Sequence, residues 1–357
     1  MGKWIEFNIH DRVGMGVAEE APTASLMKDM FEPFLSEGLD HHDLRITGKI
    51  VPVDGVSYGE HDYRYTDESL HVEDMNVQIL RDEQGFRVNG TRELLTATLP
   101  LVDRVAVTRD AAMIHAATVD FRGHGLCMPA WGGVGKTSTV AKLVRLEGFA
   151  FMGDDWAFLS GDGQLLGYAK PMFIKPHHRP IYPHIFREKR KPLVPSRLSK
   201  PIAELTTMVH PVVTRYPRLA GVTRRWSPEH IMVTPREAFP GARISERAQL
   251  AVVVFVERFD GHDAVLEGKD RAWMVSRLIG NFHREMSLHS RELVNALGAT
   301  GMLPIERHFA EKAEVLAKAL TGAPSFLLRV PVGFPPDQAS YVIVDHLKKA
   351  LAEAGIS

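Results

Sequence analysis

The chain has 357 residues, of which 45% are hydrophobic and 24% are charged, and its formal net charge is −1. These values are typical of a globular protein large enough to bury a sizeable core, and they exclude a disordered or strongly basic nucleic-acid-coating chain. No apolar run approaches the length of a membrane span, the first residues lack a signal-peptide core, and the single cysteine, Cys127, excludes an internal disulfide. We therefore expect a cytoplasmic protein without a membrane partner.

The first hundred residues are acidic, with nineteen Asp and Glu against nine Lys and Arg. Alternating apolar residues predict a strand at 4–9, and helical spacing predicts a helix at 24–35. Short strands between turn residues are expected at 44–53, 77–80 and 86–88. We find no site motif in this region. It is predicted to form a separate N-terminal mixed α/β domain over residues 1–104.

The most informative segment is a glycine-rich run that follows an apolar stretch at 126–130 and precedes a predicted helix. Such a turn lets consecutive backbone N–H groups point at phosphate oxygens, and the helix that begins near Gly135 adds its positive dipole end. Lys136 would add a full charge, and the Thr137 hydroxyl would be a ligand for Mg²⁺. The alternative is a glycine-rich surface turn before an ordinary helix. The predicted nucleotide-binding residues are Ala130, Trp131, Gly132, Gly133, Val134, Gly135, Lys136, Thr137 and Ser138.

A pair of acids follows the next apolar run, at 149–152, as Asp154 and Asp155. A strand that ends there would place both carboxylates beside the bound phosphates. Two adjacent carboxylates are costly unless a cation or a proton separates their charges, and Mg²⁺ and a substrate hydroxyl would supply both. The alternative is an acidic β-turn that leads into a strand at 156–159.

From residue 115 to residue 159 the chain resembles the catalytic domain of HPr kinase/phosphorylase and its relatives. These are P-loop kinases whose fold is similar to that of phosphoenolpyruvate carboxykinase. The resemblance implies a P-loop kinase domain over residues 105–357, ATP and Mg²⁺ as cofactors, and transfer of the γ-phosphoryl group to a hydroxyl of a protein, peptide or small molecule. It also implies a tendency to form homo-oligomers. The matching residues are His115, Val119, Asp120, Gly123, His124, Gly125, Lys136, Thr137, Ala141, Leu143, Gly148, Asp154 and Asp155.

Carried over residue by residue, the resemblance assigns Asp154 as the base that accepts the hydroxyl proton. Asp155 and Thr137 would be Mg²⁺ ligands, and Lys136 would hold the β-phosphate. His115 would lie near the acid pair and the transferred phosphoryl group. These roles are coherent because phosphoryl transfer depends mainly on positioning and on neutralising charge. For His115 alone, a hydrogen-bonded histidine within a strand is an equal alternative.

The chain departs from the family in two places. Ala130 stands at the first loop glycine, and the segment 173–180 has no clear counterpart of the family's glycine-containing signature with its glutamate. Two other functions therefore stay open. One is a nucleotide-gated regulatory or binding NTPase without phosphotransfer, and the other is a module that has lost turnover. The Asn-Lys-x-Asp motif expected of a switch GTPase does not occur in the sequence.

A basic, proline-rich insertion is expected around residues 176–247, since residues 175–247 carry fifteen Lys and Arg against five Asp and Glu. It would act as a mobile lid or as a dock for an acidic substrate. The alternative is a solvated region packed on the acidic N-terminal domain. Nucleic-acid binding is not favoured, because aromatic residues are not regularly interleaved with the basic ones.

The last third of the chain is expected to complete the sheet and cover it with helices. A strand at 250–256 ends at Glu257, which is either a second Mg²⁺-facing carboxylate or part of a plain core strand. One amphipathic helix at 271–297 would carry Arg277, Arg284 and Arg291 on one face, as a phosphate or substrate clamp or as a solvent-facing stripe. Further elements are expected at 304–320 (helix), 325–330 (strand) and 336–352 (helix).

Overall fold

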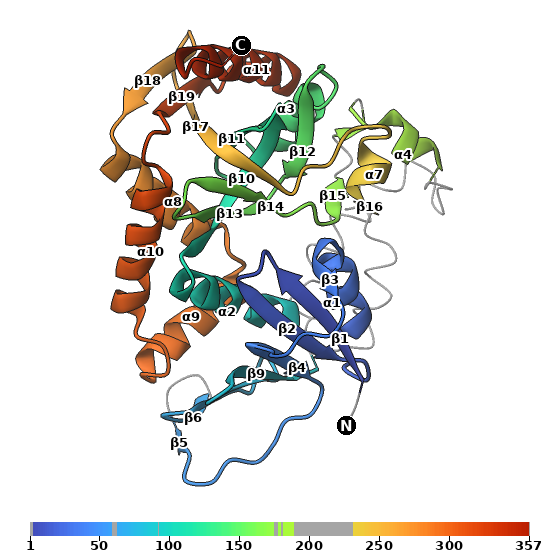
Figure 1. The fold of residues 1–357 in the computed structure, drawn as a ribbon, viewed down its shortest axis with the longest axis vertical. Helices are drawn as coiled ribbons and strands as arrows, with labels where there is room; N and C mark the ends of the chain where they lie inside the picture. Colours follow the sequence, from blue (N-terminus) through green and yellow to red (C-terminus); the bar gives the residue numbers. More distant parts are fainter. Residues whose placement is uncertain are drawn as a thin grey trace. The chain divides into compact units, whose positions relative to one another are not determined.

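The structure is a computed structural model that describes residues 3–58, 63–91, 93–174, 178–179, 181–188 and 231–356. The chain forms two compact units, one of residues 1–170 with 242–357 and the other of residues 171–241. The fold is mixed α/β, as the sequence predicts (Figure 1). Within the described ranges, no helix has both the length and the apolar character needed to cross a bilayer.

The N-terminal part of the larger unit forms a sheet whose order, in the described residues, is β3-β1-β2-β4-β9-β8-β7-β6-β5. Strands β1 and β2 form a hairpin in which Trp4 pairs with Ala18 and Ile9 with Val13. The predicted strand at 4–9 is confirmed. The bounds are Trp4–Ile9 (β1), Val13–Ala18 (β2), Leu35–Ser36 (β3), Leu44–Thr47 (β4), Ser57–Tyr58 (β5), Tyr63–Thr66 (β6), Ser69–Val72 (β7), Val77–Asp82 (β8) and Gly85–Gly90 (β9).

Two predicted elements of this region are shorter than expected. The helix predicted at 24–35 is α1, Ala24–Met30, followed by a short 3₁₀ helix, Glu32–Phe34. Pro33 explains the early end, because proline has no N–H for a helical hydrogen bond and disfavours helical geometry in the residue before it. The strand predicted at 44–53 ends at Thr47. Gly48 and Pro52 follow, and both residue types weaken a strand interior.

The second sheet of the larger unit carries the glycine-rich loop. Its order in the described chain is β11-β10-β13-β14-β17-β19-β18, and β12 pairs with β10. Strand β11 also pairs with β17, so that β10, β11, β17, β14 and β13 close a ring. The closure is possible because β17 is long enough to pair with β14, β11 and β19 along successive parts of its length. The bounds are Ala111–Phe121 (β10), His124–Pro129 (β11), Phe149–Gly153 (β12), Trp156–Ser160 (β13), Gln164–Gly167 (β14), Arg247–Phe259 (β17), Val265–Lys269 (β18) and Ser325–Pro331 (β19).

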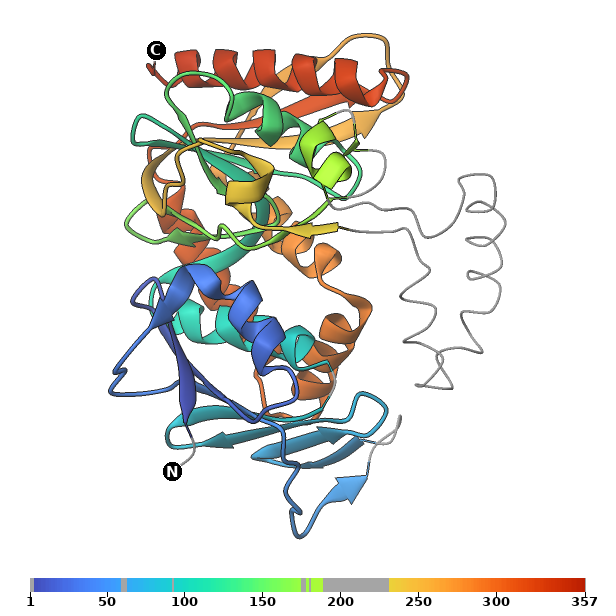
Figure 2. The ribbon, with the colours of Figure 1, turned by 90° about the vertical axis from the view of Figure 1, so that its right-hand side faces the viewer.

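Helices cover this sheet and connect it to the first one. The closing helix α11 runs beside α3 (Figure 2) and also contacts β19. The helix predicted at 271–297 is two helices, α8 and α9. Ser287 begins the second one, since its Oγ accepts the Ser290 N–H at 3.0 Å. Arg291 therefore does not share a helix with Arg277 and Arg284. The bounds are Leu94–Thr108 (α2), Lys136–Leu143 (α3), Arg271–Glu285 (α8), Leu288–Ala299 (α9), Ile305–Ala319 (α10) and Pro336–Glu353 (α11).

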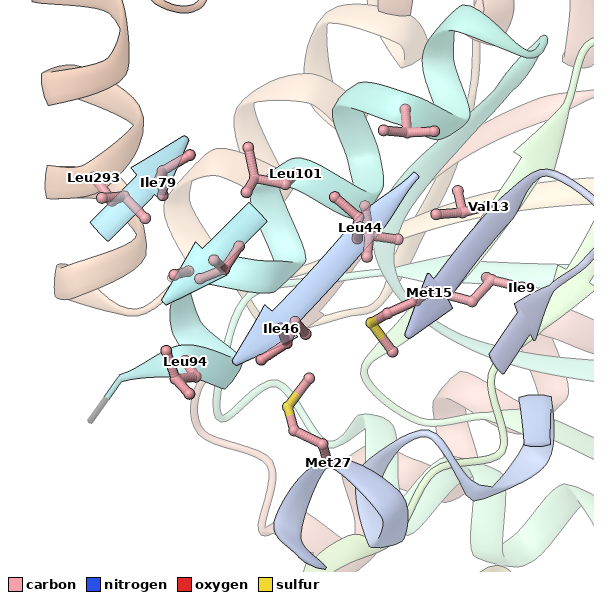
Figure 3. Packing of buried hydrophobic residues seen from close by; sticks show 14 of the residues in the cluster. Ile9, Val13, Met15, Met27, Leu44, Ile46, Ile79, Leu94, Leu101 and Leu293 are labelled. Atoms are coloured by element: carbon pink, nitrogen blue, oxygen red, sulfur yellow. The ribbon is translucent and has the colours of Figure 1, made fainter. Parts of the chain in front are cut away.

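One apolar cluster includes residues of both sheets, and α2 lies between them. Leu44 and Met15 of the first sheet and Leu101 of α2 belong to this cluster (Figure 3). Met113 of the second sheet belongs to it as well. The boundary expected between residues 104 and 105 thus falls inside α2, and the compact division of the chain lies at residues 170 and 241 instead. Cys127, on β11, is fully buried.

The smaller unit overlaps the predicted basic insertion. It contains a two-stranded sheet in which Met172 pairs with Val233. Thr234 begins the short helix α7 with a capping box, because its side chain and that of Glu237 each accept the other residue's backbone N–H. Residues 189–230, which carry most of the predicted insertion, lie outside the described residues, so a lid or docking role stays a prediction. The bounds are Met172–Ile174 (β15), Pro183–Glu188 (α4), Ile231–Val233 (β16) and Pro235–Ala238 (α7).

A buried ion pair joins α2 to α10. The Nζ of Lys312, which is fully buried, donates to Oδ2 of Asp103 at 2.8 Å, and Nε2 of His308 lies 3.2 Å from the same oxygen. The other oxygen of Asp103 accepts the Met113 N–H at 2.9 Å. Burial by itself would raise the pKa of Asp103, but the charges and hydrogen bonds of Lys312 and His308 together outweigh it and lower the pKa of that carboxyl. The cluster connects α2, α10 and the start of β10.

We predict that Lys312→Met destabilises the protein by about 3 to 5 kcal/mol, because it leaves the Asp103 charge buried without its cation. Urea denaturation at pH 7 measures this loss. The matched control is Lys318→Met on the same helix, whose side chain is 61% exposed and pairs with Asp110. That change should cost less than about 1 kcal/mol. Equal losses in the two variants would contradict a structural role for the buried pair.

Candidate functional site

The glycine-rich loop connects β11 to α3 within the second sheet. Ala130, the first residue of the loop, forms an isolated parallel bridge with Val256 of β17. Gly133 and Gly135 have φ angles of +79° and +116°, a region that residues with a Cβ rarely adopt. Gly135 occupies the N-cap position of α3. The path of the loop from strand to helix therefore depends on glycine at these two positions.

Lys136 is the first residue of α3, and its side chain lies beneath the loop. The residue is 9% exposed, and its Nζ donates to the carbonyl oxygens of Ala130 at 2.6 Å and Trp131 at 3.2 Å. Burial lowers the pKa of this ammonium, while the charges of three nearby carboxylates oppose the shift. The described chain thus gives the ammonium two neutral partners, and both are carbonyls of the loop itself.

The predicted acid pair lies next to the loop. Thr137 Oγ1 donates to Oδ2 of the buried Asp154 at 2.7 Å, so the first turn of α3 and the end of β12 meet here. Burial, and then the charge of Asp155, raise the pKa of Asp154 to about 7. Asp155 differs, because Lys170 Nζ donates to its Oδ2 at 2.7 Å. Burial opposes ionisation of Asp155, but the ion pair with Lys170 outweighs it and lowers the pKa to about 2.

His115 lies on β10, between the acid pair and α8. Its Nε2 is 4.0 Å from Oδ1 of Asp155 and 4.0 Å from Oε2 of Glu285. Its backbone carbonyl accepts the Asn281 side-chain N–H at 2.7 Å. Burial, and then the charge of Lys136, lower the pKa of the imidazole to about 3. The ring is therefore neutral at physiological pH, and it can act by hydrogen bonding rather than by charge.

The structure adds residues that sequence reasoning missed. Glu285 is the last residue of α8, and its Oε1 accepts the Gly132 N–H of the loop at 3.2 Å. Lys170, which pairs with Asp155, follows β14. Neither residue belongs to a motif or to a periodic pattern, so no sequence signal marks them. They reach the site because α8 packs on β10 and because β14 lies beside β13.

Glu257 pairs with Arg277, and the three predicted arginines lie on two different helices. Arg277 Nη2 donates to Oε2 of Glu257 at 2.6 Å, and the guanidinium carbon lies 5.4 Å from the centre of the Trp131 ring. Arg277 and Arg284 line a pocket beside the loop. Arg291, on α9, is not among the residues that line it. Glu257 is thus bound by an arginine, and the three-arginine face expected from the sequence is divided between two helices.

The oxygen atoms beside the loop fit a phosphate-bound magnesium ion. Mg²⁺ in phosphoryl-transfer sites takes one or two carboxylates together with phosphate oxygens and water. Thr137, Asp154 and Asp155 supply hydroxyl and carboxylate oxygens, and Oδ1 of Asp154 is buried without a hydrogen-bond partner among the described residues. Among the residues that the structure describes, no group of three or more His, Cys, Asp or Glu residues could hold a metal ion. A Mg²⁺ ion bound here would therefore need further ligands, such as phosphate oxygens and water.

Comparison with known proteins identifies no relative: no family model matches the chain, and no curated protein matches it. The resemblance to the HPr kinase family therefore depends on the motif residues at 115–159. Function must be inferred from the chemistry of the site, where the loop, the acid pair, His115 and Glu285 lie together.

We predict that Asp154→Asn stabilises the protein at pH 8 but not at pH 4. The pKa of Asp154 is about 7 in the folded protein, against 3.8 for an unperturbed Asp. The folded state therefore binds this proton more tightly, and the free energy of unfolding falls as the pH rises from about 4 to about 7. Asparagine cannot ionise, so it avoids this loss of stability. We expect the variant to be more stable than the parent by about 2 kcal/mol at pH 8. A pKa shift of about three units sets an upper limit of about 4 kcal/mol.

Urea denaturation of both proteins at pH 4 and pH 8 measures this difference. The control is Asp263→Asn at an exposed position, which should change stability by less than about 0.5 kcal/mol at either pH. A variant that is less stable than the parent at pH 8 would show that the Asp154 carboxylate is not strained by burial.

Proposed function

We propose that this protein is a kinase that transfers the γ-phosphoryl group of ATP to a hydroxyl group in the presence of Mg²⁺. One observation carries the proposal: the Thr137 hydroxyl, at the start of the loop helix, donates at 2.7 Å to a buried carboxylate, Asp154, whose pKa is raised to about 7. A loop suited to phosphate and a carboxylate suited to proton transfer thus adjoin each other.

Lys136 and the loop amides would bind the phosphate chain. The Lys136 ammonium has only loop carbonyls as hydrogen-bond partners in the described chain, and a phosphate oxygen, being charged, is a stronger partner than a carbonyl. The N-terminus of α3 adds the favourable end of the helix dipole. Mg²⁺, when bound through Thr137 and Asp155, would neutralise charge on the phosphate oxygens.

Asp154 would act as the general base. As the acceptor oxygen forms its bond to the γ-phosphorus and the bond to the bridging β,γ-oxygen breaks, ADP leaves and the hydroxyl proton goes to Asp154. A base with a pKa near 7 is ionised in about half of the molecules at neutral pH and is stronger than an ordinary carboxylate. Asp155 stays ionised because of Lys170, so the two neighbouring acids would have different roles.

His115 would orient the acid pair. Its ring is neutral, and its Nε2 lies 4.0 Å from Asp155, a distance that contact with a bound group can shorten. A neutral imidazole can donate to a carboxylate or phosphate oxygen through one nitrogen.

A second candidate function is a nucleotide-gated NTPase or binding protein without an acceptor. It is favoured by the contact between Glu285 and the Gly132 amide, since a bound phosphate would compete for that N–H and so change the position of α8's last side chain. The two functions differ in what Asp154 does, and substitution of Asp154 therefore separates them.

We predict that Asp154→Asn keeps the affinity for ATP within about threefold but lowers phosphotransfer at least 100-fold, because it removes the base and not the phosphate ligands. Calorimetry with a non-hydrolysable ATP analogue measures affinity, and labelled ATP with a panel of alcohols, sugars and peptides measures transfer. Unchanged ATP turnover in this variant would favour the gated NTPase.

The companion variant is Lys136→Met, which removes the cation of the loop. It should weaken binding of the same ATP analogue at least tenfold, under either function. Affinity equal to that of the parent protein would exclude the loop as the phosphate site.

We also predict that the rate of phosphotransfer rises with pH through about 7. Asp154 must lose its proton to act as a base, and its pKa of about 7 places that step at neutral pH. The dependence of kcat/KM on pH between 5 and 9 reports this ionisation in the free enzyme. A rate that is constant over this range would argue against Asp154 as the base.

A further inference from the structure

A pocket of about 580 Å³ opens between the loop and α8. Its volume lies in the range of small-molecule sites. Its walls come from the beginning of the loop and from one face of α8. The lining includes Trp131 and Gly132 of the loop and Gly280, Asn281, Arg284 and Glu285 of α8.

Asn281 lines this pocket and has an unused hydrogen-bond acceptor. The residue is 2% exposed, and its Nδ2 donates to the carbonyl of His115 at 2.7 Å. Its Oδ1 must therefore be the free end of the amide, and this atom is buried without a hydrogen-bond partner in the described ranges. An unpaired buried acceptor costs about 1 to 3 kcal/mol. A bound group that donates a hydrogen bond would remove that cost.

Glu285 brings a second acceptor, and this one carries a charge. Its Oε1 accepts the Gly132 N–H, a donor that the loop would give to a phosphate. Its Oε2 lies 4.0 Å from His115 Nε2, and that nitrogen lies 4.0 Å from Asp155 Oδ1. The pocket thus adjoins the acid pair through a single histidine. Arg277 and Arg284 line the same pocket, but Arg277 is paired with Glu257. Glu285 can therefore bind an ammonium group, while Arg284 can bind an anionic group.

Gly280 lines the pocket and has no side chain to fill it. A glycine within a helix costs about 1 kcal/mol relative to alanine. At this position a Cβ would meet no atom within 4 Å, so packing against the protein does not require the glycine. Because Gly280 has no side chain, a bound molecule can approach the helix closely.

We propose that this pocket is the acceptor site and that it takes a small hydroxyl compound bearing an ammonium group. Glu285 and Asn281 would hold the ammonium, and the hydroxyl would face the acid pair. Arg284 lines the same pocket, so an acceptor that also carries a carboxylate is complementary. The proposal rests on the kinase function argued above, and it names the chemical class of the acceptor.

Matched pairs of compounds that differ only in the amine test this specificity. We would compare L-serine with glycerate, ethanolamine with ethylene glycol, and D-glucosamine with D-glucose. Binding is measured by ligand-observed NMR on the whole protein with Mg²⁺ and a non-hydrolysable ATP analogue. We expect at least one amine to bind at least tenfold more tightly than its partner compound, and Glu285→Gln to abolish that preference.

Two further variants separate loss of the pocket from loss of the fold. Gly280→Leu should fill the pocket and weaken amine binding at least tenfold, with the affinity for the ATP analogue within threefold and the melting temperature retained. Ala272→Leu, at an exposed position of the same helix, is the matched control and should bind the amine as the parent does. Equal amine binding in the parent and Gly280→Leu would overturn the proposed position of the site.

The outcomes for the pocket and for the kinase can be distinguished. If no amine binds more tightly than its counterpart, or if Glu285→Gln keeps the preference, the acceptor proposal is overturned whether or not ATP is turned over. If an amine binds in a Glu285-dependent manner, ³¹P NMR with ATP decides its role. A phosphorylated amine supports the acceptor site, and its absence despite binding overturns the acceptor role of this pocket. The kinase function is decided separately, by transfer from labelled ATP to the wider panel of alcohols, sugars and peptides.

Discussion

The ammonium of Lys136 lies buried beneath the loop, where main-chain carbonyls and nearby carboxylates compensate its charge. A charge removed from water is tolerated only with such partners, so its position constrains everything around it. The loop bends so that Ala130 and Trp131 direct their carbonyls at it. Asp154 and Asp155, from the turn between β12 and β13, and Glu285, from the end of α8, lie within its field. This cation is thus the electrostatic centre of the site.

The acid pair shows how different surroundings give two identical carboxyl groups different pKa values. Asp154 and Asp155 are neighbours in sequence, yet one is buried beside a neutral hydroxyl and the other is paired with Lys170. The pKa of the first is therefore raised and that of the second is lowered. The proposed phosphoryl transfer to a hydroxyl would use one carboxylate that can take a proton and one that stays charged. The burial and the partner of each residue favour that division of roles.

Packing links this site to the buried ion pair between α2 and α10. The Lys312 ammonium lies 3.4 Å from the centre of the Phe282 ring, and Phe282 lies edge-on to Trp156 at 5.5 Å. Trp156 in turn lies edge-on to His115 at 5.1 Å. The position of His115 therefore depends on contacts that begin at the ion pair between α2 and α10, and α2 packs on the first sheet. This is a physical reason for the N-terminal residues to share one compact unit with the site.

Local patterns in the sequence determined much of the second sheet. Apolar runs located β11, β12, β17 and β19, and glycine spacing located the loop, because a buried strand and a left-handed turn each restrict residue type at particular positions. Tertiary structure alone decided that β11 pairs with β17 and that Glu285, Lys170 and Asn281 reach the site. These contacts join residues far apart in the chain. A single sequence carries no periodic signal for such contacts, because each arises from the packing of whole elements and not from the conformational preference of a segment.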